Sequence, residues 1–144
     1  MIQPLSDITV IDASSYISGP FCTKYLADMG ATVIKVESPR GGDVSRRLSP
    51  FYNDTPSSDG SGVFLFMNSN KQGITLDLET DTGRDIFLEL VAKADVLVED
   101  FHPDFLASRG IGYAELSAIN EQLVMTSVTP FGQTGPYIDM TGEE

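Results

Sequence analysis

Residues 8–37 read Ile-Thr-Val-Ile-Asp-Ala-Ser-Ser-Tyr-Ile-Ser-Gly-Pro-Phe-Cys-Thr-Lys-Tyr-Leu-Ala-Asp-Met-Gly-Ala-Thr-Val-Ile-Lys-Val-Glu, and this stretch decides the fold. The β-branched runs at 8–12 and 32–37 predict two strands. Gly19 and Pro20 open a helix between them, and Gly30 ends it as a left-handed cap. A strand–helix–strand unit implies parallel pairing with a right-handed crossover.

The helix within this unit carries apolar residues at helical spacing. Phe21, Cys22, Tyr25, Leu26 and Met29 fall on one face. We expect this face to pack against the sheet, which makes Cys22 a core thiol.

The rest of the chain continues the alternation. Further strands are predicted at 73–77, 95–99 and 123–128, and helices at 80–94, 104–108 and 113–120. Residues 50–62 form a surface loop, and residues 63–67 are either a buried strand or a helical turn. The predicted fold is α/β: a Rossmann-like open, mainly parallel sheet with helices on both faces, present as an incomplete domain.

Composition narrows the class of protein. The 144 residues fit one domain, and the net charge of −12 argues against binding to nucleic acid. The single cysteine, Cys22, allows no intrachain disulfide and favours a reducing cytoplasm. We find no apolar run of membrane-spanning length, no export signal and no metal-ligand spacing.

Polar residues end the predicted strands, where open α/β sheets bind ligands. They are Asp12, Glu37, Asp77, Glu99 and Ser127. The turn after the first strand lacks the GxGxxG pattern, so a nicotinamide cofactor is not supported.

Two loops are candidate functional segments. Arg40, Arg46 and Arg47 follow the second strand and form either an anion clamp or a solvated loop. The tail, 129–144, holds three glycines and two prolines, which predicts a loop with several bends. We expect the chain to be incomplete, cut where a site begins.

Read together, several segments resemble the class III coenzyme A transferases, the family of formyl-CoA and carnitine CoA transferases and of α-methylacyl-CoA racemase. The resemblance rests on Ile-Asp at 11–12, the run 18–37, Gly-Gly-Asp-Val-Ser-Arg at 41–46, Asn-Ser-Asn-Lys-Gln-Gly-Ile-Thr-Leu-Asp-Leu at 68–78, Ala-Asp-Val-Leu-Val-Glu-Asp-Phe-His-Pro at 94–103 and Phe-Gly-Gln-Thr-Gly-Pro-Tyr at 131–137. Their order and spacing are collinear over almost the whole chain.

The resemblance implies a large Rossmann-like domain, a small second domain and two interlocked subunits in the full-length homodimer. Residues 1–144 would be the N-terminal part of the large domain, with the small domain absent. CoA would move between an acyl-CoA and a free carboxylic acid through an aspartyl anhydride. The nucleophilic Asp would lie beyond Glu144, so we expect this chain alone to be inactive. CoA is then a substrate, and no tightly bound cofactor is expected.

The resemblance also places individual residues. The CoA contacts fall on Ile17, Ser18, Leu76, Asp77, Asp100, Phe101 and His102. A family acid near the reacting carbonyl falls on Glu144, the candidate catalytic residue. Glu143 stands where racemases have His, which weighs against a racemase.

Three positions depart from the family. Ile17 replaces a frequent Gln, Glu79 replaces a common Lys, and a frequent Arg falls on Ser108. Arg40 and Arg109 are the candidates to compensate for the lost charge. These departures leave a second hypothesis open, in which the chain is a non-catalytic half that binds CoA or acts as a dimer scaffold.

Overall fold

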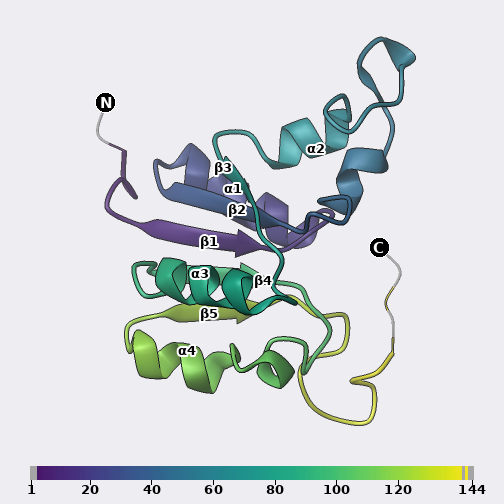
Figure 1. Cartoon of the computed structure of the whole chain (residues 1–144). Coiled ribbons are helices and arrows are strands. Elements are labelled where there is room, and N and C mark those ends of the chain that lie inside the picture. Colours follow the sequence, from purple (N-terminus) through teal and green to yellow (C-terminus); the bar gives the residue numbers. More distant parts are fainter. Residues whose placement is uncertain (1–2, 141, 143–144) are drawn as a thin grey trace.

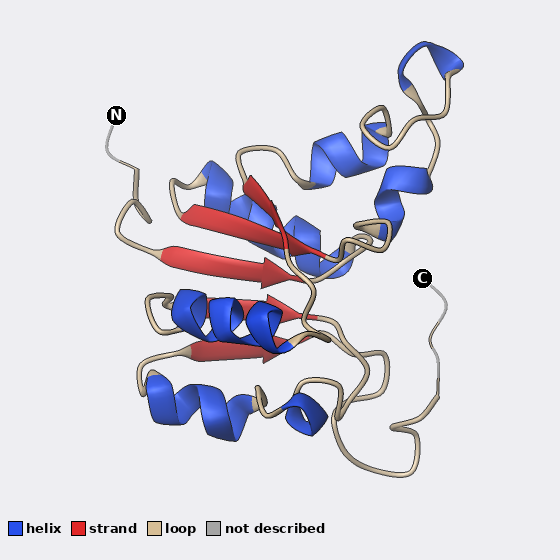
Figure 2. Ribbon diagram, viewed as in Figure 1, coloured by secondary structure: helices blue, strands red, loops and turns tan. Residues whose placement is uncertain are grey.

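The computed structural model describes residues 3–140 and 142, and they form a single five-stranded sheet (Figures 1 and 2). The strands are β1 (Thr9–Ala13), β2 (Thr32–Glu37), β3 (Gln72–Thr75), β4 (Val96–Glu99) and β5 (Val124–Ser127). Their order is β3-β2-β1-β4-β5, and every neighbouring pair is parallel. The predicted strands and their parallel arrangement are confirmed.

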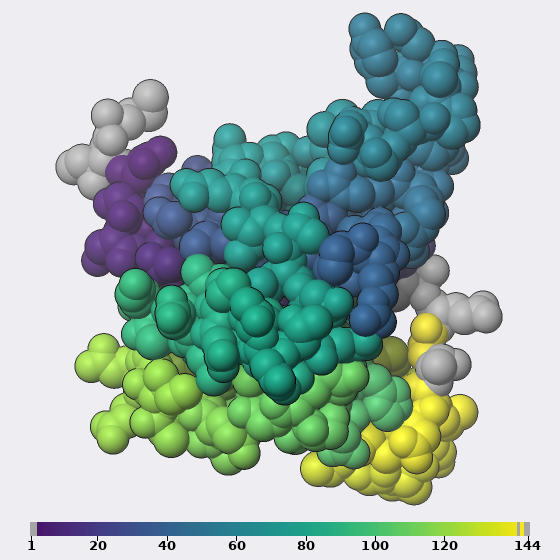
Figure 3. All heavy atoms as spheres, viewed as in Figure 1, coloured from purple at the N-terminus to yellow at the C-terminus, as the bar shows by residue number. Residues whose placement is uncertain are grey.

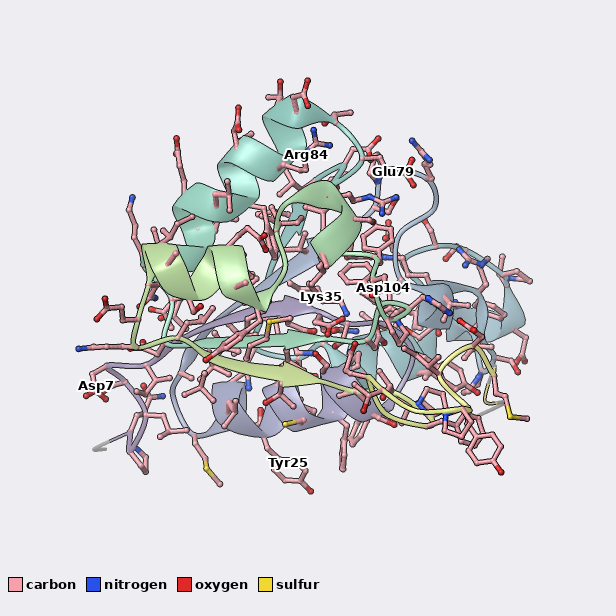
Figure 4. All side chains as sticks on the ribbon, turned by 90° about the horizontal axis from the view of Figure 1, so that it is seen from below. Asp7, Tyr25, Lys35, Glu79, Arg84 and Asp104 are labelled. Atoms are coloured by element: carbon pink, nitrogen blue, oxygen red, sulfur yellow. The ribbon has the colours of Figure 1, made fainter. Side chains whose placement is uncertain are left out.

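Helices cover both faces of this sheet. Helix α1 (Ser18–Asp28) lies on one face, while α3 (Asp81–Val91) and α4 (Tyr113–Ile119) lie on the other (Figure 4). The face under α3 and α4 holds the larger apolar core, which includes Ile11, Phe87 and Leu97. The predicted three-layer α/β architecture is therefore confirmed.

The direction of chain progression reverses at β1. From β1 the chain proceeds to β2 and β3 on one side, and it then returns to β4 and β5 on the other. The connections after β1 and β4 leave the sheet in opposite directions, and such a switch point is where open α/β sheets form a ligand crevice.

Helix α1 packs against the sheet with a different face from the one its sequence predicted. The buried residues are the small ones, Gly19, Pro20, Thr23 and Ala27. A Cβ atom at Gly19 would lie 2.2 Å from the Ser14 hydroxyl oxygen, so glycine permits a very close approach of the helix to β1. Close packing of backbones selects small residues over large apolar ones.

The predicted apolar face of α1 consequently points outward. Phe21, Tyr25 and Met29 are exposed, and only Leu26 is partly buried against the smaller core. Cys22 is also exposed, so the prediction of a core thiol is wrong.

The structure also decides the conformation of two short segments, residues 62–67 and 104–109. Residues 62–67 form a helix, α2 (Gly62–Met67), which is the helical alternative for the apolar run that follows the loop. The predicted helix at 104–108 is instead a turn followed by the 3-10 helix Ala107–Arg109, which Gly110 ends with φ of 70°. The segment between β2 and α2 projects from the body (Figure 3).

Candidate functional site

A crevice opens at the carboxyl ends of β1, β2, β3 and β4. Its volume is about 240 Å³. Four residues predicted as CoA contacts line it, Leu76, Asp77, Asp100 and Phe101, together with Arg40, the candidate to compensate for lost charge. The topology brings these residues together from three segments that are far apart in the sequence.

Buried ionic groups support the turn that forms the floor of the crevice. Asp12 and Lys35 are register partners on β1 and β2, and both are almost completely buried. Lys35 Nζ lies 2.8 Å from Asp43 Oδ2 and 3.8 Å from Asp12 Oδ2, and it donates to the Ser14 carbonyl. Because a buried charge needs partners, this arrangement fixes the Ser14 backbone.

A second lysine completes the network. Lys71 Nζ donates to Asp12 Oδ2 at 2.8 Å, to the Pro20 carbonyl at 2.8 Å and to Asn68 Oδ1 at 2.9 Å. Burial lowers the pKa of Lys71, and the nearby Asp12 carboxylate opposes that effect. Desolvation would raise the pKa of Asp12, but the two lysines outweigh it and the pKa is lowered, which keeps the carboxylate ionised.

Arg46, one of the three arginines proposed for an anion clamp, forms an ion pair with Glu37 inside the protein. Arg46 binds both Glu37 oxygens at 2.7 Å, and its guanidinium lies 3.6 Å from the Phe64 ring centroid. Glu37 also accepts the Asp43 backbone N–H at 2.8 Å. Arg46 therefore shapes the loop, whereas Arg40 faces the crevice and Arg47 is exposed.

Asp100 forms part of the crevice wall next to β1. Its Oδ2 accepts the Ser15 backbone N–H at 2.6 Å. Burial raises the pKa of Asp100 to about 7; the Asp12 and Asp43 carboxylates add to this rise, whereas the Ser15 hydrogen bond and Lys35 oppose it. Asp100 therefore changes charge near neutral pH, unlike an ordinary aspartate.

At the mouth of the crevice, Glu79 lies between Arg40 and Arg109. Arg40 is ion-paired with Glu79 and lies 3.4 Å from Asp77 Oδ2, and Arg109 Nη2 lies 3.8 Å from Glu79 Oε1. Figure 4 shows Glu79 at the outer rim, while Lys35 lies in the interior at the level of the strands.

The remaining predicted residues lie around the crevice or outside the described part of the chain. Ile17 is the residue before α1, and Ser18 is the first residue of that helix. His102 is exposed and lies 3.8 Å from Asp139, an acidic neighbour that its sequence context did not indicate. Glu143 and Glu144 lie outside the described residues.

The sequence prediction missed the lysines of the buried network. Lys35 interrupts a run of β-branched residues in a strand covered on both faces, and this is a detectable signal of a buried charge with a partner. Lys71 gives no comparable signal, because its partner Asp12 lies 59 positions away. No group of three or more metal-ligating side chains occurs within residues 3–140, and no helix there is long and apolar enough to cross a membrane.

The parallel sheet, with helices on both faces and a crevice at the switch point, defines a Rossmann-like α/β domain. The sequence profile of CoA-transferase family III matches residues 5–143. The chain belongs to this family.

Characterised relatives and solved structures agree with this assignment. The chain is 45% identical over 140 residues to the β subunit of succinyl-CoA–L-malate CoA-transferase from Chloroflexus aurantiacus, covering 96% of this chain and 33% of that protein. It is 43% identical to succinate–glutarate CoA-transferase from Agrobacterium fabrum, covering 96% and 35%. A CaiB/BaiF family protein from Brucella suis superimposes with a TM-score of 0.88 at 39% identity, covering 97% and 37%. The chain thus spans about a third of the length of these proteins.

Proposed function

We propose that the chain binds the CoA part of an acyl-CoA in the crevice at the carboxyl ends of β1–β4. The observation that carries this proposal is the convergence of Arg40, Leu76, Asp77, Asp100 and Phe101 on one cavity. The resemblance places CoA contacts on Leu76, Asp77, Asp100 and Phe101, and Arg40 is the candidate to compensate for the positive charge that is absent at position 79.

We further propose that residues 1–144 are the N-terminal Rossmann-like part of the large domain of a cytoplasmic CoA transferase, with the small domain outside this chain. The reaction would transfer CoA from an acyl-CoA to a free carboxylic acid through an aspartyl anhydride. The attacking Asp would follow Glu144, and Glu144 would lie near the reacting carbonyl. Because two of the relatives use succinyl-CoA or succinate, dicarboxylic acids are the first substrates to test.

The second candidate is a CoA-binding or scaffold half without chemistry. The observation that favours it is Glu79, which places a negative charge at the crevice mouth and forms ion pairs with Arg40 and Arg109. A CoA transferase reaction requires turnover of acyl-CoA by the protein that carries this chain, and the scaffold alternative predicts binding only. The acyl-CoA racemase alternative has no supporting observation among the described residues.

Calorimetric titration of the chain with CoA tests the binding step. Arg40 lines the crevice, whereas Arg84 forms a comparable surface ion pair with Asp81 on α3. We expect Arg40→Gln to weaken CoA binding about tenfold or more, since a hydrogen bond to a charged group contributes about 1.5–3 kcal/mol. Arg84→Gln should bind like the wild type. Absence of binding by the wild-type chain, or equal losses in both variants, would contradict the proposal.

A further inference from the structure

Asp100 differs from the other acidic residues of the crevice in having no cationic partner. Within residues 3–140 it forms no ion pair, and its hydrogen-bond donor is the Ser15 backbone N–H, 2.6 Å from Oδ2. The other four carboxylates that line the crevice each form an ion pair: Glu37 with Arg46, Asp43 with Lys35, and Asp77 and Glu79 with Arg40.

The surroundings of Asp100 are largely apolar. Asp100 lines the crevice and also a second cavity of about 220 Å³, which the tail residues Phe131 and Ile138 help to form. Beside it in the crevice wall, the rings of Phe101 and Phe105 stack with centroids 4.5 Å apart. Apolar walls remove water from a carboxylate and disfavour its charged form. Burial is accordingly the largest cause of the raised pKa of Asp100.

The charged groups around Asp100 are mainly acidic. Lys35 on β2 favours the ionised form, whereas Asp12 on β1 and Asp43 after β2 oppose it. An anion that enters the crevice adds negative charge beside Asp100 and displaces water, and both effects favour the neutral carboxylic acid. The remaining ionisable groups that line the two cavities are Glu37, Arg40, Asp77, Glu79 and His102, and Glu99 precedes Asp100 in the chain.

We propose that Asp100 couples the binding of an anion in the crevice to the uptake of one proton from solvent, so that its charge sets the preference of the crevice for anionic over neutral ligands. The protonated carboxyl keeps an oxygen for the Ser15 N–H and gains an O–H donor that faces the ligand. The ionised carboxylate repels the anion instead. The choice of CoA as that anion rests on the proposed function, whereas the coupling applies to any anion in the crevice.

The coupling fixes the direction of the pH dependence. The pKa of Asp100 in the free chain is about 7, and the bound anion raises it. With a rise of about one pKa unit, the affinity for the anion is about fivefold lower at pH 8 than at pH 6. Near pH 7.5, binding then takes up about half a proton per ligand.

The test compares the wild type with Asp100→Asn and with the control Asp85→Asn, an exposed aspartate on α3. CoA and the uncharged pantetheine are titrated by calorimetry between pH 6 and 8, in two buffers of different ionisation enthalpy. We expect Asp100→Asn to bind CoA about fivefold more tightly than the wild type at pH 8 and equally at pH 6. Asp85→Asn should follow the wild type, and pantetheine affinity should not depend on pH.

Sulfate provides a second probe, because its charge is constant over this range and its binding does not depend on recognition of CoA. The Ser15 amide signal in NMR reports the titration of Asp100 through their hydrogen bond. Saturating sulfate should move the midpoint of that titration in the wild type from about pH 7 to about pH 8.

The outcomes separate the coupling from the proposed function. Equal pH profiles of CoA binding in the wild type and Asp100→Asn, with an unmoved Ser15 midpoint, would overturn the coupling and leave CoA binding intact. An equal pH dependence for pantetheine would also overturn it. If sulfate moves the midpoint but CoA does not bind, the coupling stands and the proposed CoA function fails. If neither anion binds at any pH, both fail.

Discussion

Replacement of Asp100 by Asn should change how the stability of the chain depends on pH. The structure holds Asp100 against the Ser15 N–H, and an Asn oxygen accepts the same hydrogen bond without a charge. Charged groups face Asp100 from three segments: Asp12 on β1, Lys35 on β2 and Asp43 in the following loop. The substitution therefore removes one titration while keeping shape and hydrogen bonding.

The sign and size of the effect follow from linkage. Burial raises the pKa of Asp100 from 3.8 to about 7, so the folded chain holds this proton more tightly than the unfolded chain. The stabilisation from the bound proton is complete below about pH 4 and is lost as the pH rises to about 7. A rise of about three pKa units corresponds to about 4 kcal/mol in the free energy of unfolding. Because Asp100 is partly accessible to water, we expect a loss of about 2–4 kcal/mol.

Urea unfolding between pH 4 and 8 measures this difference. We expect Asp100→Asn to be more stable than the wild type by about 2–4 kcal/mol at pH 8, with the difference closing towards pH 4. Asp85→Asn, an exposed change on α3, is the matched control and should follow the wild-type curve. Parallel curves for the wild type and Asp100→Asn across this range would refute the reasoning.

Two further predictions concern the buried network and the outer face of α1. Lys71→Met should lower the free energy of unfolding by about 3–5 kcal/mol, because the buried Asp12 carboxylate loses its 2.8 Å partner and keeps only Lys35, 3.8 Å away. The control Lys93→Met, at an exposed site, should change the free energy of unfolding little. Equal losses for the two variants in denaturant unfolding would contradict this prediction. We also propose that the protein forms a homodimer that buries Phe21, Tyr25 and Phe66, because these aromatic residues of α1 and α2 are all exposed and adjacent exposed apolar residues often mark a protein–protein contact. Sedimentation should then show a dimer that Phe66→Ser weakens, and a monomeric wild type would count against it.

Much of the fold was predictable from local sequence because its signals are local. The β-branched run at 32–37 became β2 with the predicted bounds, and Gly30 ends α1 with a positive φ. Thr80 caps α3 by accepting the Gly83 N–H at 3.0 Å, near the predicted start of that helix. The parallel direction of the strands follows from the alternation of strands and helices, since a crossover connection returns the chain to the same edge of the sheet before the next strand begins. Of the polar residues at the strand ends, Glu37 and Asp77 line the crevice, whereas Asp12, Glu99 and Ser127 do not.

The sequence did not reveal which residues far apart along the chain lie close together in space, or which face of α1 packs against the sheet. The apolar spacing of α1 predicted burial of its large residues against the sheet, but close packing at Gly19 buries the face of small residues instead. The joining of Lys71 to Asp12 and of Arg109 to Glu79 depends on how the crossovers place separate loops at one sheet edge. The sequence by itself determined the sheet, the acidic charge and the family resemblance. Only the tertiary structure decided which charges meet, because pairing energies depend on separation in space and not on separation along the chain.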